Sequence, residues 1–135
     1  MPLDEKIMGF SNRWYEPAMG SAVVNELEPD LRVRVVTAVY FCATKLEAFA
    51  GRGKHDYQSS HDLEDLMAVM DGRPELAEEI HSGPEHVRTY IAAEFRKLFA
   101  TREFLDALPG YLLPDQASQA RVSILLERLQ KIAAI

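Results

Sequence analysis

The chain has 135 residues, of which 47% are hydrophobic and 27% charged, and this is the composition of an ordinary globular protein. Its length suits one domain over residues 1–135 that buries a single core without disulfides or a structural metal. The net charge of −6 argues against general nucleic-acid binding, because proteins with that role carry a basic face.

The amino-terminal segment predicts an irregular stretch that aromatic side chains tie to the rest of the protein. A short helix is predicted around residues 12–19. Phe10, Trp14 and Tyr15 are expected to pack on the main body, because an aromatic cluster in a terminal segment usually holds that segment in place. For Trp14 the alternative is stacking on a ligand.

A β-hairpin is predicted next. Two strand-type runs, residues 22–27 and 31–37, flank the turn sequence Glu28-Pro29-Asp30. The second run alternates apolar residues with two arginines, as a half-buried strand does. A lone hairpin is marginal in water, so this one is expected to pack on other elements.

The remainder of the chain has the three- and four-residue apolar spacing of helices. Helices are predicted from Thr37 to Gly51, from Ser59 or Ser60 to Gly72, from Pro74 to His81, from Pro84 to Thr101, and from Asp115 onward, with a short turn at residues 103–108. The expected class is α+β and mostly α, with an amino-terminal β-hairpin packed on a bundle of about five helices.

Three basic residues lie near the end of the first long helix. Lys45 and Arg52 are seven residues apart and project from nearly the same line of a helix, and Lys54 follows in a glycine loop. Such cations can hold a polyphosphate, since Lys acts as a point charge and Arg as a bidentate fork. A solvated helix edge with no specific ligand is the alternative.

Acidic residues open the next helix. Asp62 follows Ser59 at the spacing of a capping box, and acids in a first turn complement the helix dipole. The functional interpretation places Asp62 against Lys45 or Arg52 and makes Asp62 and Asp65 acids that orient these cations. For Asp65 the alternative is simple exposure to solvent.

The motifs of several other site types do not occur in the sequence. The residues His55, Asp56, His61, Asp62 and Asp65 lack the paired spacings of a zinc site, so no metal site is predicted. No Gly-x-Gly-x-x-Gly motif, Walker loop or Gly-x-Ser-x-Gly elbow occurs.

The location is expected to be cytoplasmic. The single cysteine, Cys42, falls on an apolar helix face and cannot form an intrachain disulfide, so a reducing compartment is expected. No run of about 18 apolar residues occurs, and no membrane contact is expected. The segment MPLDEKIMGF lacks the apolar core of a secretory signal.

The motifs between Arg34 and Leu66, taken together, resemble those of nucleotidyltransferase-fold proteins of the abortive-infection toxin type. In that family a strand leads into a helix with a Lys-Leu-x-Ala core, and a basic loop precedes a helix that opens on a motif like Asp-Leu-x-Asp-Leu. The matching runs here are Arg34-Val35-Val36-Thr37, Tyr40-Phe41, Ala43-Thr44-Lys45-Leu46-Glu47-Ala48-Phe49, Gly51-Arg52-Gly53-Lys54 and Ser60-His61-Asp62-Leu63-Glu64-Asp65-Leu66.

The resemblance implies transfer of a nucleoside monophosphate from a nucleoside triphosphate, with Mg²⁺ held by acidic residues. Lys45 would face the nucleotide phosphates, and Asp62 and Asp65 would be the acids of the later helix. However, the Asp-x-Asp pair that holds the metal in the family is absent from the sequence. Because in-line phosphoryl chemistry depends on that metal, the chain is expected to be inactive alone and to retain weak nucleotide or phosphate binding.

The opening residues, Met1 to Glu5, resemble the segment that follows the third metal-binding strand in the family. The chain is therefore expected to correspond to the carboxyl-terminal portion of a larger protein, with Mg²⁺ and a triphosphate relevant if the missing acids are supplied elsewhere. The alternative function is a non-enzymatic helical interaction module that forms a homodimer or binds a partner protein such as an antitoxin. An exposed strand edge would favour such pairing.

Overall fold

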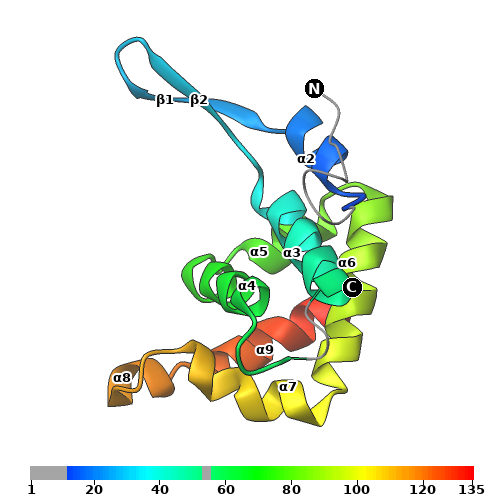
Figure 1. The fold of residues 1–135 in the computed structure, drawn as a ribbon, viewed down its shortest axis with the longest axis vertical. Coiled ribbons are helices and arrows are strands. Elements are labelled where there is room, and N and C mark those ends of the chain that lie inside the picture. The colour runs from blue at the N-terminus through cyan, green and yellow to red at the C-terminus, as the bar shows by residue number, and fades with distance from the viewer. Residues whose placement is uncertain (1–11, 53–55) are drawn as a thin grey trace.

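The computed structural model describes residues 12–52 and 56–135, which are mostly helical (Figure 1). The expected class, α+β and mostly α, is confirmed. The described elements are α2 (Tyr15–Gly20), β1 (Val23–Glu28), β2 (Leu31–Val35), α3 (Ala38–Arg52), α4 (His61–Gly72), α5 (Leu76–His81), α6 (Glu85–Phe99), α7 (Arg102–Ala107), the 3₁₀ helix η1 (Leu108–Tyr111), α8 (Gln116–Gln119) and α9 (Val122–Ala133).

The core lies among the four longest of these helices. Helix α6 packs on both α9 and α3, and α3 packs on α4. Each helix contributes apolar residues at three- and four-residue intervals, which place them on one face. Fully buried members of this core include Leu63, Leu66, Met67, Met70, Ile91, Phe95, Leu125 and Leu129. Burial of one such side chain stabilises the fold by about 1.5–3 kcal/mol.

Helix α4 begins one residue later than the capping box predicts. The Ser60 hydroxyl oxygen accepts a hydrogen bond from the Leu63 amide at 3.2 Å, so Ser60 is the N-cap. The Ser59 amide instead donates to Asp56 Oδ1 at 3.0 Å. The predicted pairing of Ser59 with Asp62 as a capping box is therefore wrong, because the local turn at Asp56 holds Ser59 outside the helix.

Two other boundaries differ from the prediction. The turn expected at residues 103–108 is the helix α7 followed by η1. The single helix expected from Asp115 is divided into α8 and α9 by a turn at residues 120–121. Asp115 is nevertheless an N-cap, since its Oδ1 accepts from the Ser118 amide at 2.8 Å.

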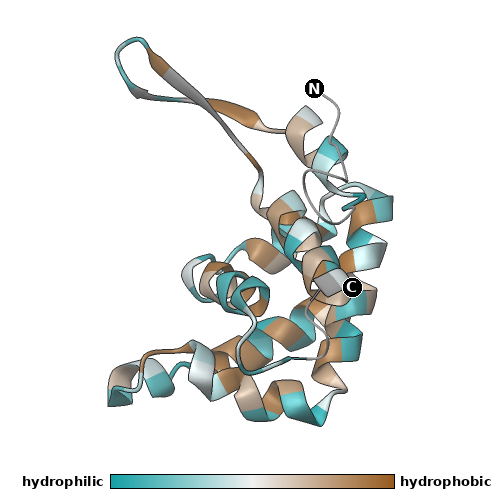
Figure 2. Ribbon diagram, in the orientation of Figure 1, coloured by the Kyte–Doolittle hydropathy of each residue, from teal (hydrophilic) through white to brown (hydrophobic). Residues whose placement is uncertain are grey.

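The hairpin does not pack on the helices as expected. Strands β1 and β2 pair antiparallel, and Figure 1 shows the ribbon projecting away from the bundle. Figure 2 shows apolar colour on this ribbon, far from the core. Val23, Val24 and Leu31 are 53%, 56% and 45% exposed. The long helices pack their apolar faces against one another, and neither strand makes more than slight contact with a described helix.

The turn between the strands contains a left-handed residue. Asp30, which directly follows Pro29, has a φ of 68°, as the third residue of a type II turn does. Asp tolerates this conformation better than most residues do. Elsewhere, no helix in the described ranges is long and apolar enough to cross a membrane.

Candidate functional site

Lys45 of α3 and two aspartates of α4 meet where these helices pack together. Lys45 Nζ lies 2.8 Å from Asp65 Oδ2 and 3.6 Å from Asp62 Oδ1. Asp62 and Asp65 are three residues apart, which puts both on one side of α4. The structure thus brings together one of the three predicted phosphate-binding residues and both of the acids that were predicted to orient them.

The three charged side chains differ in burial. The Asp62 side chain is 7% exposed, whereas those of Lys45 and Asp65 are 25% and 49% exposed. A buried carboxylate is stable only with compensating partners, and the Lys45 ammonium supplies one. Lys45 Nζ also lies 5.5 Å from the centroid of the Phe41 ring. Two carboxylates and one ammonium leave this cluster with a net negative charge.

The other two predicted phosphate-binding residues are not placed. Arg52 is the last residue of α3, and its side chain is outside the described part of the structure. Lys54 lies within residues 53–55, which also fall outside it. The prediction that Arg52 and Lys54 join Lys45 around a phosphate therefore stays a prediction.

The segment before the hairpin is held against α3 and α6. The Asn12 side-chain amide donates to the carbonyl oxygen of Thr44 at 2.8 Å, and its oxygen accepts from the Trp14 amide. Trp14 is only 6% exposed, and its ring stacks on His86 with centroids 5.6 Å apart. The packing expected for Trp14 is confirmed, while Phe10 lies outside the described residues.

A charged and aromatic cluster completes this attachment. The Arg13 guanidinium lies 4.4 Å from the centroid of the Tyr90 ring and 3.5 Å from Glu47. The Tyr90 hydroxyl donates to Glu47 Oε2 at 2.5 Å. Burial, together with the bond to Glu47, raises the pKa of Tyr90 well above its usual range. Tyr90 is thus a neutral hydrogen-bond donor that links α6 to α3.

Cys42 lies in the core, as its apolar helix face predicts. It is fully buried, and this burial raises the pKa of the thiol to about 12, with a smaller contribution from Glu79. A thiol that stays protonated is a poor nucleophile.

The carboxyl end of α4 faces basic side chains from the last part of the chain. Arg128 Nη1 donates to the carbonyl oxygens of Met70 and Asp71 at 2.6 and 2.8 Å. Arg121 Nε donates to Asp71 Oδ1 at 2.5 Å. The Arg128 bonds satisfy carbonyls that a helix end leaves without partners, and both cations complement the negative end of the dipole. Arg121 and Arg128 were not predicted, although their seven-residue spacing puts them on one line of a helix.

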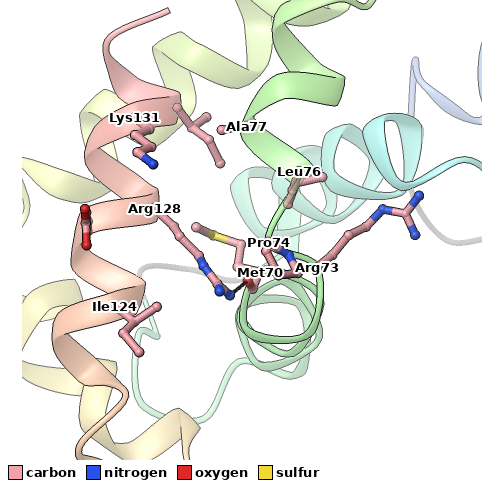
Figure 3. Close-up of a pocket in the computed structure, with 10 residues that line it drawn as sticks. Met70, Arg73, Pro74, Leu76, Ala77, Ile124, Arg128 and Lys131 are labelled. Carbon is pink, nitrogen blue, oxygen red and sulfur yellow. Dashed lines mark hydrogen bonds between the residues drawn. The ribbon is translucent and has the colours of Figure 1, made fainter.

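A cavity of about 240 Å³ lies beside this contact, between α4, α5 and α9. Figure 3 shows Arg128 reaching from α9 toward Met70, whereas Arg73 points away from α9. The Arg73 guanidinium binds Glu79 through two bonds, of 2.5 and 2.9 Å. Both arginines at this cavity are therefore already engaged within the protein.

No family model, no curated protein and no solved structure matches this chain. Over residues 12–52 and 56–135, no group of three or more His, Cys, Asp and Glu side chains is arranged to hold a metal ion.

Proposed function

We propose that this chain is a non-enzymatic interaction module that adds its projecting hairpin to a β-sheet of a partner. The observation that carries the proposal is the position of β1 and β2, which form a two-stranded sheet clear of the helices. Two strands alone are marginally stable in water, and an exposed strand edge is a template for a further strand. Strand addition gives affinity through main-chain hydrogen bonds.

The apolar surface at the base of the hairpin supports the same function. A cavity of about 290 Å³ lies between α2, α3 and the end of the hairpin, and its lining is almost entirely apolar. Met19, which lines it, is 53% exposed. Exposed apolar surface is a feature that many interaction sites in proteins share.

The surroundings of Lys45 weigh against nucleotide binding at the α3–α4 contact. Its ammonium contacts both Asp62 and Asp65, so a phosphate would have to displace at least one carboxylate. The net negative charge of the cluster also repels a polyphosphate. The nucleotidyltransferase-like alternative therefore has less support than the interaction module, although the family resemblance still motivates its test.

Site-specific photo-cross-linking from the hairpin tests the proposed function. A photoreactive amino acid at Val24 is expected to give an adduct in cells, and the cross-linked peptide should map to a sheet-edge strand of the partner. The matched control is the same amino acid at Leu113, which is 70% exposed and lies in another part of the molecule. The same adducts from both positions, or none from Val24, would remove the proposal.

Calorimetry tests the nucleotide alternative separately. Nucleoside triphosphates, titrated with and without Mg²⁺, are expected to give no heat that depends on Lys45. Heat that Lys45→Met abolishes would revive the nucleotide-binding hypothesis.

A further inference from the structure

We propose that the strand which pairs with this hairpin is β1 of a second copy of the chain, antiparallel and centred on Val24. The two hairpins would then form one four-stranded sheet across a two-fold axis. This inference rests on the proposed function and specifies its partner.

Symmetry restricts how two identical strands can pair. In an antiparallel pair the outward-pointing backbone groups belong to alternate residues. A two-fold axis must therefore pass through a residue that faces its own copy. Each strand offers only a few such arrangements, and the charges on each strand distinguish them.

Self-pairing of β2 is disfavoured by its arginines. The arrangement that overlaps the whole of Leu31–Val35 centres on Val33 and sets Arg32 opposite Arg34 of the other copy, twice over. Like charges directly opposite each other destabilise a strand pair.

Self-pairing of β1 about Val24 avoids this conflict. Val24 faces its own copy, Val23 faces Asn25, and Glu26 faces Ala22 beyond the end of the strand. Within each hairpin the backbone of Glu26 is paired with that of Arg32. The paired segment ends before the bulge between Glu26 and Glu28, where the ladder is irregular. This pairing places Val23 and Val24, which are exposed in the single chain, beside residues of the second copy.

Four strands also overcome the instability of the isolated hairpin, because sheets of three or more strands support themselves better than two do. A pairing of β1 with β2 of the next copy would also match opposite charges, but it leaves free strands at both ends. Such a contact grows into an open chain of copies rather than a closed dimer.

Cysteine cross-linking tests both the partner and the register. In the proposed dimer the two Val24 Cα atoms are about 4.5–5.5 Å apart, which is within disulfide range. Two Val23 residues lie on a diagonal at about 7–8 Å, beyond that range. Under mild oxidation Val24→Cys should therefore give a disulfide-linked dimer, while Val23→Cys should not. The native Cys42 is buried and does not interfere.

A mixture provides a further control. Val23→Cys and Asn25→Cys, each unreactive alone, should cross-link when mixed, since position 23 faces position 25 of the other copy. Equal cross-linking of Val23→Cys and Val24→Cys alone would overturn the proposed register.

Sedimentation of the full chain over a concentration series tests the assembly. The unmodified chain is expected to reach a dimer and stop there, and Val24→Glu should raise the dissociation constant about fivefold by setting like charges opposite each other. Val24→Thr, which keeps a β-branched neutral residue, should stay close to the unmodified chain. A monomer at all concentrations, or open-ended growth, would overturn the inference.

These outcomes separate the two proposals. A monomeric chain that still forms a Val24 adduct with a strand of a different protein would remove the second copy as partner and leave the proposed function standing. The absence of any Val24 adduct would remove both.

Discussion

The ammonium of Lys45 lies 3.6 Å from the buried carboxylate of Asp62, so a charge on α3 compensates a charge on α4. Replacement of Lys45 by Met keeps most of the side-chain volume and removes this compensation. We expect a loss of about 1–3 kcal/mol in the free energy of unfolding, measured by urea denaturation. Asp62 retains further contacts, which limits the loss.

The matched control is Lys97→Met. Lys97 lies 3.0 Å from Glu94, but its side chain is 71% exposed. An exposed pair contributes only about 0–1 kcal/mol. A loss for Lys45→Met no larger than that for Lys97→Met would show that burial of Asp62 does not depend on Lys45.

Replacement of Ser60 by Ala removes the N-cap of α4. We expect the urea midpoint to fall by an amount equivalent to about 1 kcal/mol, because the Leu63 amide loses its acceptor. Ser59→Ala is the control, since the Ser59 bond uses its backbone amide and survives the substitution. If the two variants lost equal stability, Ser60 would not be the N-cap.

Replacement of Arg128 by Ala removes two donors from the carboxyl end of α4. The carbonyls of Met70 and Asp71 are part of a partly buried contact, so their loss of partners should cost about 1–3 kcal/mol. Calorimetric melting should show a lower Tm. Lys131→Ala, an exposed position one turn further along α9, is expected to change the Tm much less. A similar change from both would mean that general charge, and not capping, stabilises this end.

Cys42 gives the stability a specific dependence on alkaline pH. Its pKa is about 12 in the folded chain and 9.0 without the fold, so only the unfolded thiol ionises between these values. Stability is therefore complete below about pH 9 and falls as pH rises, by up to about 1.4 kcal/mol per unit from this group. Cys42→Ala should show a shallower decline in urea titrations between pH 8 and 11. Parallel curves for the two proteins would contradict the assignment.

The long helices and the strands of the hairpin were predictable from the sequence, and a contact of Asp62 with Lys45 or Arg52 was one of its two interpretations. Apolar spacing defines one face of each helix, and that face also determines which charged residues stand at its border. The choice between Ser59 and Ser60 was not predictable, because both are good caps and only the bond from Ser59 to Asp56 separates them. Similarly, the turn that divides α8 from α9 interrupts a stretch of helix-forming residues.

Features that depend on contacts between distant parts of the chain could not be predicted from the sequence. Arg121 and Arg128 bind residues about 50 and 58 positions earlier, and no local pattern specifies such a partner. The position of the hairpin depends in the same way on distant contacts, because it follows from how the helices pack their apolar faces together. The alternating pattern of the hairpin correctly predicted two strands but did not show whether other elements pack on them.

Helix α4 is attached at both ends to parts of the chain that are far apart in sequence. Its first turn is tied to α3 through Lys45, and its last turn is tied to Arg121 and to α9 through Arg128. Opening either end alone would break contacts with a distant part of the chain, so partial unfolding gains little conformational freedom. The amide hydrogens of α4 should accordingly exchange with solvent only when the whole bundle unfolds, which makes this helix the slowest-exchanging segment and the hairpin the fastest of the described elements.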